Sequence, residues 1–238
     1  MNPQANESRK DLAGGLPAVI RLRPEPVRSL TEEAYQRLEE MIVTLELAPG
    51  SVVSEAILSE RLGIGTTPIR EALQRLAREY LVQILPRRGV VVTAIDVRQQ
   101  LQVLETRREL DRLIAVCATR RSLPAERQRI GAVAAAMEAA VEAGDVRGFL
   151  RLDGDLNTLA ALAARNEIAA STVATLHSVS RRFWFYHQQD NPRAPRTMAL
   201  HVGLARAIAS GDEAAAATAS EALTEHLFDF ARGTLIAA

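Results

Sequence analysis

The sequence predicts a mostly α-helical protein, in which a small helix-and-hairpin unit precedes an antiparallel bundle of about six helices. Aromatic residues make up only 4% of the 238 residues, whereas hydrophobic residues reach 47%. Alanine is abundant, and this composition favours close-packed helices over sandwiches of sheets. From Val97 onward, apolar residues recur at helical spacing almost without interruption, which predicts the bundle.

The N-terminal region divides into an arm and a helix. Residues 1–29 are rich in Pro, Asn and Gly and lack sustained periodicity, so we expect a flexible arm. The run from Ser29 to Glu32 has the spacing of a capping box, which predicts a helix over about 30–45. The apolar side of this helix would consist of Ala34, Leu38, Met41, Ile42 and Leu45.

A short helix, a tight turn and a longer helix are predicted over about 54–78. Gly63 and Gly65 break the chain where the turn would lie. Thr67 is predicted to cap the longer helix, with Pro68 at the first helical position. One side of that helix is apolar, and the other carries Arg70, Gln74 and Arg78.

Two β-prone runs follow at 81–85 and 90–93, joined by Pro86, Arg87, Arg88 and Gly89, which predicts a basic hairpin. A helix-turn-helix followed by such a hairpin is typical of a winged helix. Its second helix enters the major groove of DNA, and its wing meets the backbone or the minor groove. The alternative is a small packing unit whose arginines are merely solvated.

Charge is distributed unevenly along the chain. The whole sequence is neutral, with 29 basic and 29 acidic residues, so a global basic excess is absent. Between Arg70 and Arg88, however, five arginines face only Glu71 and Glu79. Positive charge is therefore concentrated on the predicted recognition helix and wing. The weak overall charge predicts modest non-specific affinity for DNA.

The segment 30–94 resembles the GntR family of bacterial transcription regulators. The resemblance depends on Tyr35, Leu38, Ile42, Leu47-Ala48-Pro49-Gly50, Glu55, Leu62-Gly63-Ile64, Thr67-Pro68-Ile69-Arg70-Glu71-Ala72-Leu73, Arg75-Leu76, Leu81-Val82, Pro86, Arg88-Gly89 and Val91. The chain departs from the family at Gly65 and Thr66, where Ser-Arg is common, and at Ala56, where the family can carry an arginine. The DNA-binding residues that the pattern and the resemblance imply are Thr66, Thr67, Arg70, Gln74, Arg87, Arg88 and Gly89.

Residues 95–238 predict six helices with short connections, over about 97–121, 125–143, 146–164, 168–188, 194–209 and 213–233. The single cysteine, Cys117, lies in an apolar helical run, which favours a place in the core. A lone cysteine, no run long enough to span a membrane and no secretory signal together predict a cytoplasmic protein.

This half resembles the FCD domain, the effector-binding and dimerisation domain of the fatty-acid-responsive branch of the GntR family. The matching features are Glu105, Arg107, Asp111, Asp153, Arg165-Asn166, Leu200-His201, Ile208-Ala209 and Gly211-Asp212. The resemblance implies a homodimer and a small-molecule effector inside the bundle. We therefore expect three segments: an arm at 1–29, a DNA-binding domain at 30–94 and an effector-binding domain at 95–238.

Many FCD domains bind a divalent metal through one Asp and three His. Here Asp153 and His201 match the family positions, but Asn157 stands where the second ligand would be. The last family position falls on Leu223, and His226 lies one turn later. The candidate ligands for a metal such as zinc are therefore Asp153, Asn157, His201 and His226. The alternative is a hydrogen-bonded polar network without metal.

The effector-binding candidates are Arg107, Asp153, Asn157, Arg181 and His201. By resemblance Arg107 faces the cavity, where a guanidinium suits a carboxylate because it makes two parallel hydrogen bonds. An intrahelical pair with Asp111 is an equally good interpretation. Around the aromatic cluster of 180–187, one face with His177, Arg181 and Trp184 could line a ligand pocket. The favoured alternative places Phe183, Trp184 and Tyr186 in the bundle core or a dimer contact.

Three functions compete at this point. The first is a transcription regulator, a repressor by family custom, whose dimer binds a double-stranded DNA operator and responds to a small carboxylate. The second is a ligand-independent DNA-binding dimer with a purely structural bundle. The third is an enzyme that activates water at a metal held by Asp153, His201 and His226. The chain shows no phosphate loop and no HExxH motif, and its DNA-binding segment also disfavours an enzyme.

Overall fold

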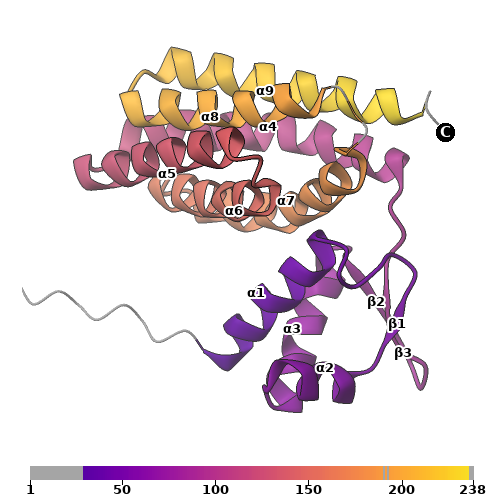
Figure 1. Cartoon of the computed structure of the whole chain (residues 1–238). Helices are drawn as coiled ribbons and strands as arrows, with labels where there is room; N and C mark the ends of the chain where they lie inside the picture. Colours follow the sequence, from indigo (N-terminus) through magenta and orange to yellow (C-terminus); the bar gives the residue numbers. More distant parts are fainter. Residues whose placement is uncertain (1–28, 190, 192, 236–238) are drawn as a thin grey trace, which may run out of the picture.

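The computed structural model describes residues 29–189, 191 and 193–235. The predicted arm therefore falls outside the described residues, apart from Ser29. A small unit of helices and strands lies beneath a larger layer of long helices (Figure 1). In chain order the elements are α1 Leu30–Val43, β1 Val52–Val53, α2 Glu55–Leu62, α3 Thr66–Arg78, β2 Val82–Leu85, β3 Gly89–Val92, α4 Val97–Arg121, α5 Pro124–Glu142, α6 Val146–Ala163, α7 Glu167–His187, α8 Ala194–Ser210 and α9 Glu213–Thr234.

The first helix begins where the sequence predicts and ends slightly earlier. The Ser29 hydroxyl accepts a hydrogen bond from the Glu32 backbone N–H at 3.1 Å, which satisfies one of the free donors of the first turn. Helix α1 stops at Val43, because Leu45 adopts a left-handed backbone with φ 62°. The predicted apolar residues Ala34, Leu38, Met41 and Ile42 are all buried.

The predicted cap of the recognition helix is wrong. Helix α3 begins at Thr66, its N-cap is Gly65, and no side chain caps it. Pro68 is thus the third helical residue instead of the first. Proline is tolerated there because the first four backbone N–H groups of a helix have no intrahelical acceptor. The preceding turn follows the prediction, since Gly63 ends α2 with φ 65°.

The wing is a three-stranded sheet, whereas the sequence predicted a two-stranded ribbon. The strands are ordered β1-β3-β2 and all pairs are antiparallel. Val52 pairs with Val91 on one side of β3, and Gln83 pairs with Val91 on the other. Strand β1 has only two residues, which is too short for an alternating pattern to predict.

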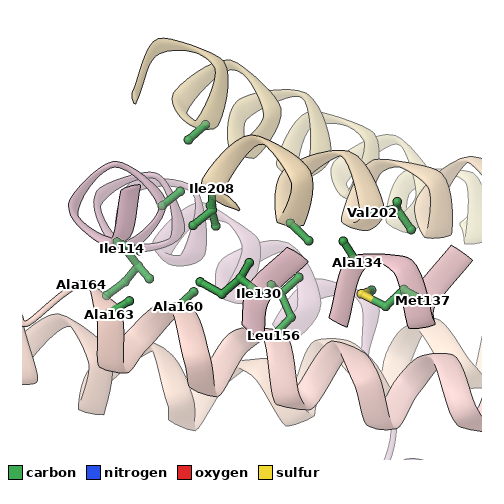
Figure 2. Packing of buried hydrophobic residues seen from close by; sticks show 14 of the residues in the cluster. Ile114, Ile130, Ala134, Met137, Leu156, Ala160, Ala163, Ala164, Val202 and Ile208 are labelled. Carbon is green, nitrogen blue, oxygen red and sulfur yellow. The ribbon is translucent and has the colours of Figure 1, made fainter. Parts of the chain in front are cut away.

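Six long helices, α4 to α9, form the bundle in the described part of the chain, as the sequence predicts. Their core is built from small and branched side chains, among them Ile114, Ile130, Ala134, Leu156 and Ile208 (Figure 2). Alanine at many of the contact positions lets the helices approach closely, which accounts for the small share of aromatic residues. Cys117 is buried in the same core, as predicted.

Helix α7 joins the bundle to the winged unit. Val179 of α7 and Val103 of α4 belong to the hydrophobic core of the winged unit. Arg182 is buried and donates hydrogen bonds to the carbonyl oxygen and hydroxyl of Thr93, at 3.1 and 3.0 Å. Burial lowers the pKa of Arg182 to about 10. The end of the wing is therefore fastened to α7.

Among the described residues, no helix is both long and apolar enough to cross a membrane.

Candidate functional site

The exposed face of α3 carries the predicted base-contacting residues. Thr66, Thr67, Arg70 and Gln74 are all exposed, while Ile69, Ala72, Leu73 and Leu76 bury the opposite side. The helical period produces this division, because residues three and four apart share a face. The free face can therefore enter a groove of DNA without disturbing the core.

Arg70 is held in place by a neighbouring helix. Its guanidinium donates to both carboxylate oxygens of Glu55, with distances of 2.7 to 3.2 Å. Glu55 lies in the first turn of α2, so the pair links the two helices of the helix-turn-helix. The pairing raises the pKa of Arg70 further, which leaves it charged at any working pH. Glu55 thus orients a cation that remains exposed.

The hairpin tip presents Arg87 and Arg88 to solvent. Two residues of this turn, Arg87 with φ 63° and Gly89 with φ 96°, adopt left-handed backbone. A Cβ on Gly89 would lie 2.9 Å from the Val53 carbonyl oxygen of the neighbouring strand. Gly89 therefore has a structural reason to be glycine, in addition to its predicted place at the DNA.

Two adjoining pockets open inside the bundle, with atom-free volumes of about 350 and 470 Å³, which include open solvent. Both are lined by Arg107, Asn157, His177 and His201. Trp184 and Arg181 line only the first pocket. The structure therefore brings together the predicted effector-binding residues Arg107, Asp153, Asn157, Arg181 and His201, since Asp153 also lines the first pocket. It also places His177, Arg181 and Trp184 there together.

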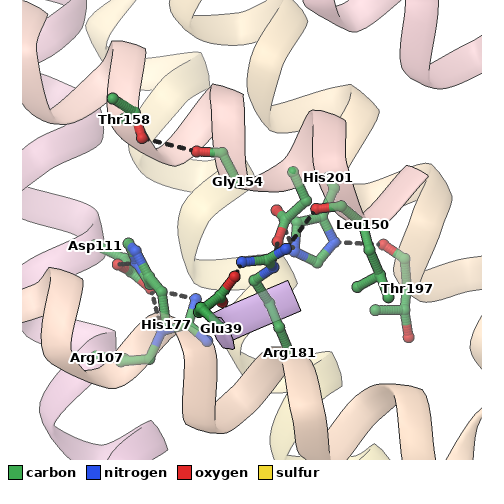
Figure 3. A network of polar contacts seen from close by, with 11 residues as sticks. Glu39, Arg107, Asp111, Leu150, Gly154, Thr158, His177, Arg181, Thr197 and His201 are labelled. Carbon is green, nitrogen blue, oxygen red and sulfur yellow. Dashed lines mark hydrogen bonds and ion pairs between the residues drawn. The ribbon is translucent and has the colours of Figure 1, made fainter. Parts of the chain in front are cut away.

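Two clusters of polar side chains include residues that line these pockets, and Figure 3 shows their contacts. In the first, Arg107 donates to Asp111 at 3.0 Å, and the His177 ring nitrogen Nε2 lies 2.9 Å from the same carboxylate. Arg107 thus pairs with Asp111 within its own helix and also lines the cavity, so the two positions expected for it do not exclude each other. Burial alone would raise the pKa of Asp111, but Arg107 and His177 outweigh burial and hold the pKa at about 2.

The second cluster is centred on Asp153. Its carboxylate lies 3.5 Å from Arg181 Nε and 3.4 Å from His201 Nε2. Arg181 also donates to the Leu150 carbonyl oxygen at 2.8 Å and to Glu39 at 2.8 Å. Glu39 belongs to α1 of the winged unit, so this cluster connects the pocket to the other half of the molecule (Figure 3).

The predicted metal set is not assembled. His226 lies outside both pockets, and its Nε2 is 3.0 Å from the Thr197 hydroxyl and 3.2 Å from the Arg193 carbonyl oxygen. Within the described residues, no group of three or more His, Cys, Asp or Glu side chains could hold a metal ion. The guanidinium of Arg181 faces Asp153 instead. Including His226 among the ligands was an error, because it lies one turn beyond the family position, which holds Leu223.

Three buried polar atoms on residues that line the first pocket make no hydrogen bond within the described residues, although two of them belong to the ion pairs of Asp153 with Arg181 and His201. The three atoms are the Asp153 oxygen Oδ1, the Arg181 nitrogen Nε and the Trp184 nitrogen Nε1. Buried polar groups are normally paired, so such atoms at a cavity wall mark positions for a ligand. Two of them are donors and one is an acceptor. A small molecule with an acidic group and a nearby donor would satisfy all three.

Sequence reasoning missed Glu39 entirely and treated Trp184 chiefly as a core or dimer-contact residue. Glu39 lies next to the buried face of an amphipathic helix, where its pattern is that of an ordinary polar residue. Trp184 is indeed buried in a hydrophobic cluster, but its indole N–H is unpaired beside the pocket. No one-dimensional signal relates Glu39 to Arg181, which lies 142 residues further along the chain.

These features define a winged-helix DNA-binding protein with a helical ligand-binding bundle. Residues 30–92 match the model for bacterial regulatory proteins of the gntR family, and residues 102–227 match the model of the FCD domain. The chain therefore belongs to the GntR family and is a DNA-binding transcription regulator with an FCD effector-binding domain. This family consists of regulators and not of enzymes.

Individual relatives agree with this assignment. A regulator in an unstable DNA locus of Streptomyces ambofaciens is 44% identical over 69 residues, which is 29% of each chain. The transcriptional repressor RspR of Escherichia coli is 26% identical over 203 residues, covering 85% of this chain and 87% of RspR. Among solved structures, E. coli McbR/YncC has a TM-score of 0.74 at 18% identity, covering 88% of this chain and all of that one. A GntR regulator from Rhodococcus has a TM-score of 0.64 at 20% identity, with 87% and 99% covered.

Proposed function

We propose that the protein is a cytoplasmic homodimeric repressor whose binding to a DNA operator is changed by a small carboxylate in the bundle pocket. The observation that carries the effector class is that Arg181 and Trp184 both line the first pocket. Among the described residues the Trp184 Nε1 donates no hydrogen bond, and the Arg181 Nε has only a 3.5 Å ion pair with Asp153. Two N–H donors on residues that line one cavity suit the oxygens of a carboxylate. The unpaired oxygen of Asp153 suits a hydroxyl or amine on the same molecule.

Homodimerisation and repression are part of the same proposal. Two winged units on a dimer would contact two half-sites, which matches the two-fold symmetry of palindromic operators. RspR, which is similar over most of its length, is described as a repressor. Light scattering tests the dimer, and a reporter gene under the selected operator tests the sign of regulation.

No role is assigned to a metal. Asp153 and His201 supply two donors, Asn157 is a weak third, and Arg181 already neutralises the carboxylate. A first-row metal prefers a full set of imidazole and carboxylate ligands, so the donors present do not fit it. Elemental analysis of purified protein is expected to show less than one metal ion per chain.

The DNA-binding half of the proposal is tested at Arg70. An operator is first selected from random duplexes, and its affinity is then compared between the wild type, Arg70→Ala and Glu60→Gln. If Arg70 contacts a base, its loss weakens operator binding by about 1–3 kcal/mol. Glu60→Gln, on α2 beside the turn, is the control and should leave the affinity within about twofold. Unchanged affinity in Arg70→Ala would remove Arg70 from the contact set.

The effector half is tested by ligand screening. Lactate, malate, citrate and gluconate are added to the wild type, and thermal stability and operator affinity are measured together. A carboxylate that stabilises the protein should also alter operator affinity, because binding to one state shifts the equilibrium between states. Stabilisation without any change in operator affinity would favour a bundle that serves only for dimerisation.

A further inference from the structure

One side chain belongs both to the pocket and to the contact between the two halves of the molecule. Arg181 of α7 lines the first pocket and donates through Nη1 to the Glu39 carboxylate of α1 at 2.8 Å. The two side chains are only 15% and 11% exposed, so the pair is largely shielded from water. Shielding strengthens the Coulomb attraction between the two charges, and loss of one partner would leave the other charge uncompensated away from water.

We infer that a carboxylate bound at Arg181 and Trp184 competes with Glu39 for the Arg181 guanidinium and so releases the DNA-binding unit from α7. This inference rests on the proposed function, since it requires a carboxylate effector. It adds the residues that pass the signal: Arg181 as the shared cation, Trp184 as a second donor to the ligand and Glu39 as the group displaced.

The charges around Arg181 explain why binding and contact compete. One guanidinium already faces two carboxylates, Asp153 at 3.5 Å and Glu39 at 2.8 Å. His201 adds positive charge only when protonated. A ligand carboxylate would bring a third negative charge to the Arg181 guanidinium, in surroundings that screen charge poorly, while Arg107 in the same pocket is already paired with Asp111. Departure of one of the three anions would relieve the repulsion among them.

Glu39 is the anion that can leave. Asp153 is fixed inside the bundle, with its side chain 5% exposed, and it lies on α6 alongside the pocket. Glu39 is on a separate unit, at the surface of α1 that faces α7, and movement of that unit would return its carboxylate to water. Solvation of a freed carboxylate offsets part of the lost attraction. Displacement of Glu39 therefore costs less than displacement of Asp153.

Arg182, the next residue on α7, relates the proposed release of Glu39 to the segment that joins the winged unit to the bundle. Arg182 follows Arg181 on α7 and donates to Thr93 and to the Ala94 carbonyl oxygen, the latter at 3.4 Å. Thr93 and Ala94 lie between β3 and α4, where the chain passes from the winged unit into the bundle. A shift of α7 that frees Glu39 would thus also strain the contacts that hold this connection. The same helix therefore senses the ligand and fastens both α1 and the linker.

The test compares Glu39→Gln with a matched control on the same helix. Glu39→Gln removes the charge but keeps an oxygen that can accept from Arg181. Glu40→Gln removes the adjacent carboxylate, which forms a 3.4 Å ion pair with Arg151 of the bundle and is largely exposed. Exposed pairs contribute little, so Glu40→Gln controls for a generic loss of charge between the two halves. Glu39→Asp, which keeps the charge but shortens the side chain, is a milder variant if Glu39→Gln folds poorly.

Two readouts are used on the full-length protein. Trp184 is the only tryptophan in the chain, so its fluorescence reports directly on the pocket during titration with lactate, malate and citrate. Hydrogen exchange of the amides at 93–96 reports on the fastening of the linker. Glu39→Gln is expected to bind the responding carboxylate at least about fivefold more tightly than the wild type. If the ligand weakens the contact between Glu39 and Arg181, then weakening that contact must strengthen binding of the ligand by the same factor. Glu39→Gln should also speed exchange at 93–96 without ligand, whereas Glu40→Gln should do neither.

The outcomes separate the two proposals. Tighter carboxylate binding and faster linker exchange in Glu39→Gln, with Glu40→Gln unchanged, support the competition. Wild-type carboxylate affinity in Glu39→Gln overturns the competition while leaving the effector class intact. The absence of any Trp184 response in all variants overturns the carboxylate effector itself, whatever the exchange data show. Equal effects of Glu39→Gln and Glu40→Gln on carboxylate affinity and linker exchange would also overturn the competition, because the loss of any carboxylate on this face of α1 would then act alike.

Discussion

Asp111 is the residue whose charge the structure uses most heavily inside the bundle. Its carboxylate accepts from Arg107 at 3.0 Å and lies 2.9 Å from His177, and its side chain is 16% exposed. Asp111→Asn keeps the size and shape of the side chain but removes the negative charge. Arg107 would then be a buried cation without a counter-charge, which is strongly unfavourable. The substitution should therefore destabilise the whole FCD domain.

The magnitude follows from the pKa. The pKa of Asp111 lies at about 2 in the folded protein against an ordinary value of 3.8. Each unit corresponds to about 1.4 kcal/mol, so the charge contributes about 2 kcal/mol at pH 7. For a chain of this size the thermal midpoint of Asp111→Asn should fall by about 4–8 °C.

The pH dependence provides a second check on the same reasoning. Because the folded pKa is lowered, the contribution is complete well above pH 3.8 and is lost as the pH falls toward 2. The gap in thermal midpoint between wild type and Asp111→Asn should therefore be present at pH 5 and above and narrow below pH 4. Glu109→Gln on the same helix breaks only an exposed pair with Arg108 and serves as the control. Equal midpoints for Asp111→Asn and Glu109→Gln at pH 7 would refute the electrostatic account.

Two further predictions concern the wing and the last helix. Gly89→Ala should destabilise the winged unit by about 1–3 kcal/mol and weaken operator binding, because the new Cβ meets the Val53 carbonyl oxygen at φ 96°. Gly203 lies at an open helical position of α8, so Gly203→Ala should instead stabilise the protein by about 0.5–1 kcal/mol. Similar thermal midpoints for Gly89→Ala and Gly203→Ala would contradict the predicted backbone strain at position 89. Burial lowers the pKa of His226, with nearby arginine charge adding to it, so wild-type stability should fall as the pH drops below about 6.5. Thermal scans of His226→Gln should lack that part of the decline, and an identical pH profile would show that His226 is not its source.

The fold was largely predictable because its elements depend on local patterns. The six bundle helices follow from apolar residues at a spacing of 3.6 and from breakers such as Gly144 and Gly211, which both adopt left-handed backbone. The recognition helix and hairpin follow from the same kind of signal. Where local cues were ambiguous, the prediction was wrong. Thr67 and Gly65 can both precede Pro68 in a helix start, and β1 is too short to carry a pattern.

The predicted residues of the pocket were chosen one at a time, and the structure decided how they combine. The sequence identified Arg107, Arg181, Asp153 and His201 as candidates, and all four line the first pocket. It could not place His226, whose helical register, one turn past the family position, turns its ring toward Thr197. A shift of three residues keeps a side chain on nearly the same face but moves it about 4.5 Å along the helix, so it meets a different part of the neighbouring helix.

By itself, the sequence determined that this protein has a winged unit with local positive charge and a bundle of alanine-rich helices. Both properties arise from periodicity and composition, which are local and additive along the chain. Only the tertiary structure decided that Glu39 meets Arg181 and that Asp153 faces a guanidinium in place of a third metal ligand. Those contacts join residues far apart in the chain, and they depend on how α1, α6 and α7 pack against one another. Packing geometry is a property of the whole fold, so no local pattern could have specified it.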